Sequence, residues 1–246
     1  MKKFYYQTYS PVFQSIQEVI THMELLQVEL KDTDLENIRA FNKTYLIITQ
    51  NVFKKIGTGF FMHDDIMTVV DINFAQYFFN ALKNYTIGKN LPPAWRILFD
   101  SSKRNDLYQF IYMALGVNAH VNNDLAFTLH DVVRNDSYQN DFNKVNTIIH
   151  QSLKEVIESL NEPSKLITLA EKSLLPLYTS FLDSLIKNWR NRTWINYKNL
   201  QDKKMNSEMV ENTAENIAEK LVKIKNISDF YKLSRVYLND SSYSRI

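Results

Sequence analysis

Cysteine is absent from this chain of 246 residues. Its absence excludes disulfide bonds, thiolate metal ligands and a cysteine nucleophile, and redox chemistry therefore does not indicate a compartment. Only four glycines and five prolines are present, fewer than a fold with many tight turns needs. The sequence also lacks a phosphate-binding glycine loop, a GxSxG nucleophile elbow, an HExxH zinc motif and a protein-kinase signature. Catalysis by this chain would have to rest on histidine and carboxylate side chains.

Neither sign of charge dominates, since 29 Lys and Arg residues face 27 Asp and Glu residues. A chain this close to neutral has no electrostatic preference for nucleic acid or for an anionic membrane. No apolar run approaches the roughly 18 residues of a transmembrane helix, and the N-terminal MKKFYYQTYSPVF lacks the apolar core of a signal peptide. We therefore predict a cytoplasmic protein with no membrane span and no nucleic-acid partner.

Helical periodicity is what the chain has in abundance, because apolar residues recur every three to four positions nearly throughout. This pattern predicts an all-α fold, a single-domain multi-helix bundle with a buried central helix. We expect residues 1–225 to form one helical domain, with Asn161-Glu162-Pro163 as a connection inside it, and residues 226–246 to form a mobile tail. The predicted helices cover residues 12–31, 35–55, 65–85, 92–102, 106–133, 141–160, 164–200 and 207–223, with a break near Gly116 as an open alternative.

The stretch ALGVNAHVNNDLAFTLHD, residues 114–131, places polar side chains inside an otherwise apolar helix. At 100° per residue, Asn118 and Asn122 share a stripe with Leu125. Buried polar groups need hydrogen-bond partners. We therefore expect both asparagines to be buried and hydrogen-bonded to other helices.

His120 and Asp124 lie four residues apart on the other face of the same helix, which is also partly apolar. Two chemical uses fit this pair: both side chains could bind one metal ion, or the carboxylate could orient the imidazole and leave its other nitrogen free. A third interpretation is structural, with a buried histidine satisfied by its own carboxylate. Because a helix that is apolar on both faces lies at the centre of a bundle, we expect these groups to be shielded or to line an internal pocket.

Asp71 interrupts another apolar stripe, which includes Phe74 and Phe78. A buried carboxylate is costly unless it meets a cation, a metal ion or several donors. The structural interpretation is an ion pair with an arginine or a helix cap, and the chemical one is a metal ligand or an acid–base group. Arg192, three residues after Trp189 on an apolar helix face, could reach a carboxylate such as Asp71, or its head could stay in water.

Two further residues complete the predicted site. His63 is a fourth candidate metal ligand, although its place before Asp64 and Asp65 also fits a helix start, where acidic residues are favourable. Trp95 is either a packing residue or part of a ligand pocket. We assign catalysis to Asp71, His120 and Asp124, a single divalent metal ion to His120, Asp124, Asp71 and His63, and small-molecule ligand contacts to Asn118, Asn122, Trp95 and Arg192.

Four blocks of the sequence resemble the bacterial domain-of-unknown-function family 5995: HDDIMTVVDINFAQYFFNAL, PPAWRILF, ALGVNAHVNNDLAFTL and a later pairing of Arg190 with Trp194. The similarity runs in the same order from Phe60 to Leu200, and the block that begins at Asn118 is its most specific part. The resemblance implies an all-helical single domain and does not name a substrate.

The chain shows a weaker resemblance to the all-helical zinc phospholipase C and P1-nuclease group, which places HxxxD or HxxxE pairs around a metal cluster. The chain departs from that group, because MKKFYY holds no counterpart of its N-terminal tryptophan ligand and only five histidines are present. A three-zinc cluster is therefore not expected, whereas a single metal ion stays open.

Three functions fit these observations. The first is a metal-assisted hydrolase, in which the ion activates water and a carboxylate acts as the base. The second is a binding module whose cavity holds a small or lipid-like ligand without turnover. The third is a polar core that only locks the helices together. We rank the hydrolase slightly ahead of the other two.

Overall fold

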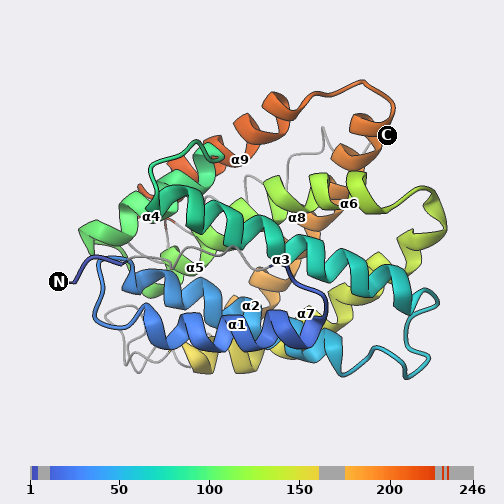
Figure 1. Ribbon diagram of the computed structural model, residues 1–246, viewed down its shortest axis with the longest axis horizontal. Coiled ribbons are helices and arrows are strands. Elements are labelled where there is room, and N and C mark those ends of the chain that lie inside the picture. Colours follow the sequence, from blue (N-terminus) through green and yellow to red (C-terminus); the bar gives the residue numbers. More distant parts are fainter. Residues whose placement is uncertain (1, 5–11, 161–174, 225–228, 230–231, 233–246) are drawn as a thin grey trace.

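Helices dominate the computed structural model, which describes residues 2–4, 12–160, 175–224, 229 and 232 (Figure 1). The elements are α1 (Ile16–Glu29), η1 (Glu36–Ile38), α2 (Arg39–Phe53), α3 (Asp64–Thr86), α4 (Pro93–Arg104), α5 (Gln109–Asn118), η2 (Ala119–Asp124), α6 (Leu125–Val132), η3 (Asp136–Tyr138), α7 (Gln139–Ser159), α8 (Leu175–Gln201) and α9 (Ser207–Leu221).

The predicted all-α bundle is confirmed. Within the described ranges there is no strand, and the only bridge pairs Lys2 with Thr33. None of the described helices is both long enough and apolar enough to pass through a bilayer. The predicted connection at residues 161–163 lies outside the described residues, as does nearly all of the predicted tail at residues 226–246.

Local sequence signals explain where several helices begin. α3 has two aspartates in its first turn, Pro93 opens α4, and the Asn206 side chain accepts the Met209 amide at the start of α9. Acidic residues, proline and asparagine are each favourable at these positions. The helix predicted over residues 35–55 differs in its start, because the short 3₁₀ segment η1 precedes α2.

A central helix runs through the bundle as three consecutive segments, α5, the π-helical η2 and α6. All of residues 111–126 are buried. α2 and α4 pack against α5, α3 and α8 pack against α6, and α9 packs against α5 and η2. Figure 1 shows α3 crossing the front of the bundle, with α9 beside α4. The central helix predicted over residues 106–133 is therefore confirmed.

Gly116 does not break the central helix but lets α2 come close to it. A methyl carbon placed on Gly116 would lie 2.3–2.6 Å from atoms of the Phe41 side chain. No larger residue fits there unless Phe41 moves. The Phe41 ring in turn contacts Trp95 and His120, with 5.4 and 5.6 Å between ring centroids. Because glycine has no side chain, α2 can pack next to the polar part of the central helix.

The π-helical segment η2 is the irregular part of the central helix. The Leu125 amide donates to the His120 carbonyl, five residues back, so the turn is wider than an α-turn. The Val121 carbonyl accepts the Thr193 hydroxyl of α8 at 2.7 Å, which satisfies a buried backbone group. Single π-turns inside α-helices are frequent at functional sites, and this one carries both His120 and Asp124.

Candidate functional site

The buried carboxylate of Asp124 organises the polar groups of η2. Trp95 Nε1 donates to its two oxygens at 3.2 and 3.0 Å, Asn123 Nδ2 donates to Oδ1 at 2.8 Å, and His120 Nδ1 lies 2.9 Å from Oδ2. Because an ionised carboxylate only accepts hydrogen bonds, the hydrogen of this last contact belongs to His120 Nδ1. The other ring nitrogen, Nε2, is left with its lone pair.

The imidazole of His120 is held between aromatic rings. Phe74 of α3 stacks on it, and Tyr45 of α2 meets it at 63° with 4.5 Å between ring centroids. Burial lowers the pKa of His120 and outweighs the hydrogen bond to Asp124, which acts in the opposite direction. The ring is therefore neutral near pH 7. Its Nε2 is buried and meets no hydrogen-bond donor among the described residues.

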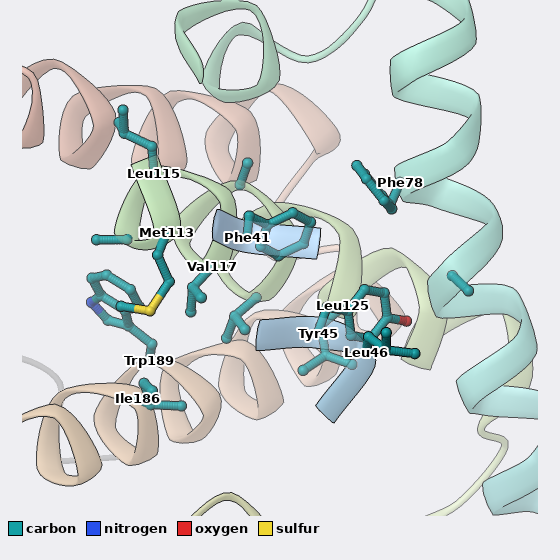
Figure 2. Packing of buried hydrophobic residues seen from close by; sticks show 14 of the residues in the cluster. Phe41, Tyr45, Leu46, Phe78, Met113, Leu115, Val117, Leu125, Ile186 and Trp189 are labelled. Carbon is teal, nitrogen blue, oxygen red and sulfur yellow. The ribbon is translucent and has the colours of Figure 1, made fainter. Parts of the chain in front are cut away.

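His120 lines a cavity of about 100 Å³, more than a single water molecule needs. Figure 2 shows part of the wall, where Met113 and Val117 of α5 face Ile186 and Trp189 of α8. Most of the wall is apolar. The hydroxyl-bearing and ionisable side chains that line it are Thr44, Tyr45, Asp71, His120, Tyr138 and Arg190.

Asp71 reaches the cavity from α3, where it is buried in the apolar stripe as predicted. Its Oδ2 is sealed from solvent and forms no hydrogen bond with the described residues. Desolvation raises the pKa of Asp71 to about 7. At neutral pH both the carboxylate and the carboxylic acid are therefore populated, so Asp71 can accept or donate a hydrogen bond. The ion pair with an arginine, one of the interpretations open for this carboxylate, is not found within the described part of the chain.

Two tyrosines lie within electrostatic range of Asp71. Burial raises the pKa of Tyr45, and the charges of Asp71 and Asp124 raise it further. Burial also raises the pKa of Tyr138; there Arg190 acts in the opposite direction and Asp71 in the same one. Asp71 therefore shares the cavity with Tyr45, His120, Tyr138 and Arg190, and it lies close enough to both tyrosines for its charge to raise their pKa values.

Arg190 of α8 brings a buried guanidinium to the cavity wall, with 5% of the residue exposed. Its Nε donates to Asn146 Oδ1 at 2.7 Å and its Nη2 to the Phe142 carbonyl at 2.8 Å, and Cζ lies 4.2 Å from the Phe142 ring centroid. Desolvation lowers the pKa of Arg190 to about 10, so the group stays charged at neutral pH. No carboxylate in the described ranges pairs with it.

The predicted metal ligands are not brought together. His63 precedes the first turn of α3, where its Nδ1 lies 2.9 Å from Asp141 Oδ2; that carboxylate also accepts the Met62 and His63 amides. Among the described residues, no group of three or more His, Asp or Glu side chains is placed to hold a metal ion. Both oxygens of Asp124 and the Nδ1 atom of His63 are engaged with protein partners, whereas His120 Nε2 and Asp71 Oδ2 are not. The predicted single-ion site of His120, Asp124, Asp71 and His63 is therefore not assembled.

The two core asparagines are buried, as predicted, but do not line the cavity. Asn118 Nδ2 donates to the Ala214 carbonyl of α9 at 2.8 Å, which confirms the predicted bond to another helix. Asn122 Nδ2 donates to Asn118 Oδ1 at 3.0 Å, so its predicted partner on another helix is wrong. Both side chains form hydrogen bonds within the protein, and their contact with a ligand stays a prediction.

The other two predicted ligand residues, Trp95 and Arg192, also lie away from the cavity wall. Trp95 is fully buried and holds Asp124, and Arg192 is half-buried. The arginine that reaches the cavity is Arg190, which sequence reasoning did not place in the site. Its position four residues after Ile186, itself a cavity residue, was the available signal.

A protein-family model described as Family of unknown function (DUF5995) matches residues 16–227, a range that contains every cavity residue named above. No curated protein and no solved structure matches the chain. The weaker resemblance to the zinc phospholipase C and P1-nuclease group finds no support in these comparisons.

Proposed function

We propose that this chain, which belongs to the Family of unknown function (DUF5995), binds a small molecule with an apolar body inside the helical bundle. One observation carries the proposal: His120 and Asp71 line the same largely apolar cavity, and neither His120 Nε2 nor Asp71 Oδ2 forms a hydrogen bond with the described residues. A buried polar atom without a partner costs about 1–3 kcal/mol. A ligand that donates to these atoms recovers that loss and covers the apolar wall.

The same two atoms define the polar end of the ligand. With its hydrogen on Nδ1, His120 can only accept at Nε2, whereas Asp71 accepts when ionised and donates when protonated. The ligand therefore carries at least one hydroxyl or N–H donor beside its apolar body.

Native mass spectrometry of the purified protein tests whether it carries such a molecule, and titration with octan-1-ol, followed by tryptophan fluorescence, tests the cavity itself. Val117→Phe places a larger side chain at the cavity wall and should abolish octan-1-ol binding. Val69→Phe, at an exposed position of α3, is the matched control and should bind normally. Unchanged binding by a folded Val117 variant would refute the proposal.

Acid–base catalysis on the bound molecule is a second candidate function, because one cavity holds both an acid and a base. Asp124 orients the neutral imidazole with Nε2 free, and Asp71 has a pKa of about 7. Incubation in deuterium oxide, followed by mass spectrometry of the small molecules released from the protein, tests for proton transfer at carbon. Deuterium should enter with the wild type and not with His120→Gln, and absence of incorporation in both would argue for binding alone.

The metal-assisted hydrolase has less support, because its ligands are not assembled within the described residues. Elemental analysis of protein prepared without an affinity tag tests it directly. A stoichiometric divalent ion that is lost in His120→Ala would restore this function as the leading candidate.

A further inference from the structure

The cation of Arg190 is the one charged group of the cavity wall that the proposed binding mode leaves unused. It is buried, it stays charged at neutral pH, and none of the described carboxylates pairs with it. A buried charge is unfavourable unless an opposite charge or a full set of hydrogen bonds compensates it. The structure gives Arg190 two acceptors, Asn146 and the Phe142 carbonyl, for its five N–H groups.

The guanidinium is also held in one orientation. Hydrogen bonds fix Nε and Nη2, and Cζ lies over the Phe142 ring, 4.2 Å from its centroid. Within the described residues Nη1 has no hydrogen-bond partner. A fixed guanidinium with free N–H groups suits a planar anion, because carboxylates accept two parallel N–H bonds and little entropy is lost on binding.

We propose that the ligand is an amphipathic carboxylate, whose carboxylate group pairs with Arg190 and whose hydroxyl or N–H donor meets His120 and Asp71. The apolar stretch between the two ends lies along wall residues such as Val117 and Trp189. This inference rests on the proposed binding function and adds the charge and the two-ended chemistry of the ligand. A phosphate group fits less well, because its additional charged oxygens would be desolvated against an apolar wall.

Isothermal titration at neutral pH with four probes of equal chain length tests the inference: octan-1-ol, octanamide, octanoate and 8-hydroxyoctanoate. Octanoate should bind roughly ten- to a hundredfold more tightly than octanamide, the range expected for a hydrogen bond to a charged group. The hydroxy acid should bind more tightly than octanoate. Arg190→Gln should remove the preference for the carboxylate and leave octan-1-ol binding unchanged, whereas Arg190→Lys should keep part of it.

The possible results separate the two proposals. Octan-1-ol binding without any preference for octanoate over octanamide overturns the inference and leaves the proposed function standing. Failure of all four probes to bind the folded protein overturns both. If Arg190→Gln does not fold, the comparison of octanoate with octanamide on the wild type decides the matter without a variant.

Discussion

The imidazole of His120 and the phenyl ring of Phe74 lie face to face, with 3.4 Å between ring centroids and 5° between ring planes. One ring belongs to the π segment of the central helix and the other to α3. Because Asp71 lies one turn before Phe74 on α3, this contact also sets the histidine relative to Asp71. Packing, and not a hydrogen bond between them, positions the two polar atoms on which ligand binding is proposed to depend.

Replacing Phe74 with leucine should therefore affect both stability and binding. We expect the free energy of unfolding to fall by about 1–2 kcal/mol from lost packing and ring contact, and octan-1-ol to bind more weakly because His120 is less well fixed. Urea unfolding and fluorescence titration measure the two effects. Phe127→Leu, at a half-buried position of α6 outside the cavity, is the control for binding. Normal ligand affinity in the Phe74 variant would mean that the stacking has no positioning role.

Asp71 should make the protein less stable as the pH rises. Its pKa is about 7 in the folded chain and about 4 in the unfolded chain. Between these values the folded state binds more protons, so stability present at low pH is lost as the pH rises toward 7. Asp71→Asn removes this loss, and its stability relative to wild type should increase by about 2–3 kcal/mol from pH 5 to pH 8.

Urea unfolding at the two pH values checks this, with Asp65→Asn on the exposed side of α3 as the control. Equal pH dependence in wild type and Asp71→Asn would show that Asp71 has an ordinary pKa and a solvated carboxylate.

Gly116→Ala should destabilise the protein although alanine favours helices. The added methyl group would meet the Phe41 side chain at 2.3–2.6 Å, and overpacking of this kind costs about 1–3 kcal/mol, more than the gain of ~1 kcal/mol in helix propensity. Combining it with Phe41→Leu should cost less than the sum of the single changes. Thermal or urea unfolding of the four proteins measures the coupling, and strict additivity would contradict the proposed close contact.

The two core asparagines should differ in their effect on stability. Asn118→Ala removes the bond to the Ala214 carbonyl and the acceptor for Asn122, so it should cost about 1–3 kcal/mol. Asn122→Ala removes one bond within its own helix and should cost less. Asn73→Ala, at a half-buried asparagine of α3 whose side chain donates to the Val69 carbonyl of its own helix, serves as the reference in the same unfolding measurements. A larger loss for Asn122→Ala would reverse this assignment.

The fold could be predicted from the sequence because helical periodicity depends only on which residues are apolar. The central helix could be recognised from apolar residues on both of its faces, and residues 111–126 are buried throughout. The π-turn could not be foreseen, since it depends on residues far along the chain, such as Thr193, whose hydroxyl donates a hydrogen bond to the Val121 carbonyl. Gly116 was ambiguous for the same reason: its role depends on Phe41 of another helix.

The candidate site could be predicted from the sequence only in part. Asp71 and His120 stood out because each is a polar residue in an apolar stripe, and both line the cavity. The metal prediction finds no support within the described residues. Counting carboxylates does not reveal their donors inside the protein, and Asp124 accepts hydrogen bonds from Trp95 and Asn123.

The inward-facing arginine was misassigned for a related reason. Spacing from Trp189 favoured Arg192, whereas spacing from Ile186 would have favoured Arg190. Periodicity alone ranks such neighbours poorly, because positions three and four residues apart lie on nearly the same face.

The π segment has a consequence for how the chain can vary in length. A π-turn inside an α-helix contains one residue more than an α-turn, while the helices on either side keep their directions. Loss of a single residue between positions 119 and 124 would leave α5 and α6 on their present neighbours but close the wide turn that presents His120. Deletion of one residue would thus change the His120 geometry without changing the helix packing, and a relative shorter by that residue would keep the bundle without this histidine geometry.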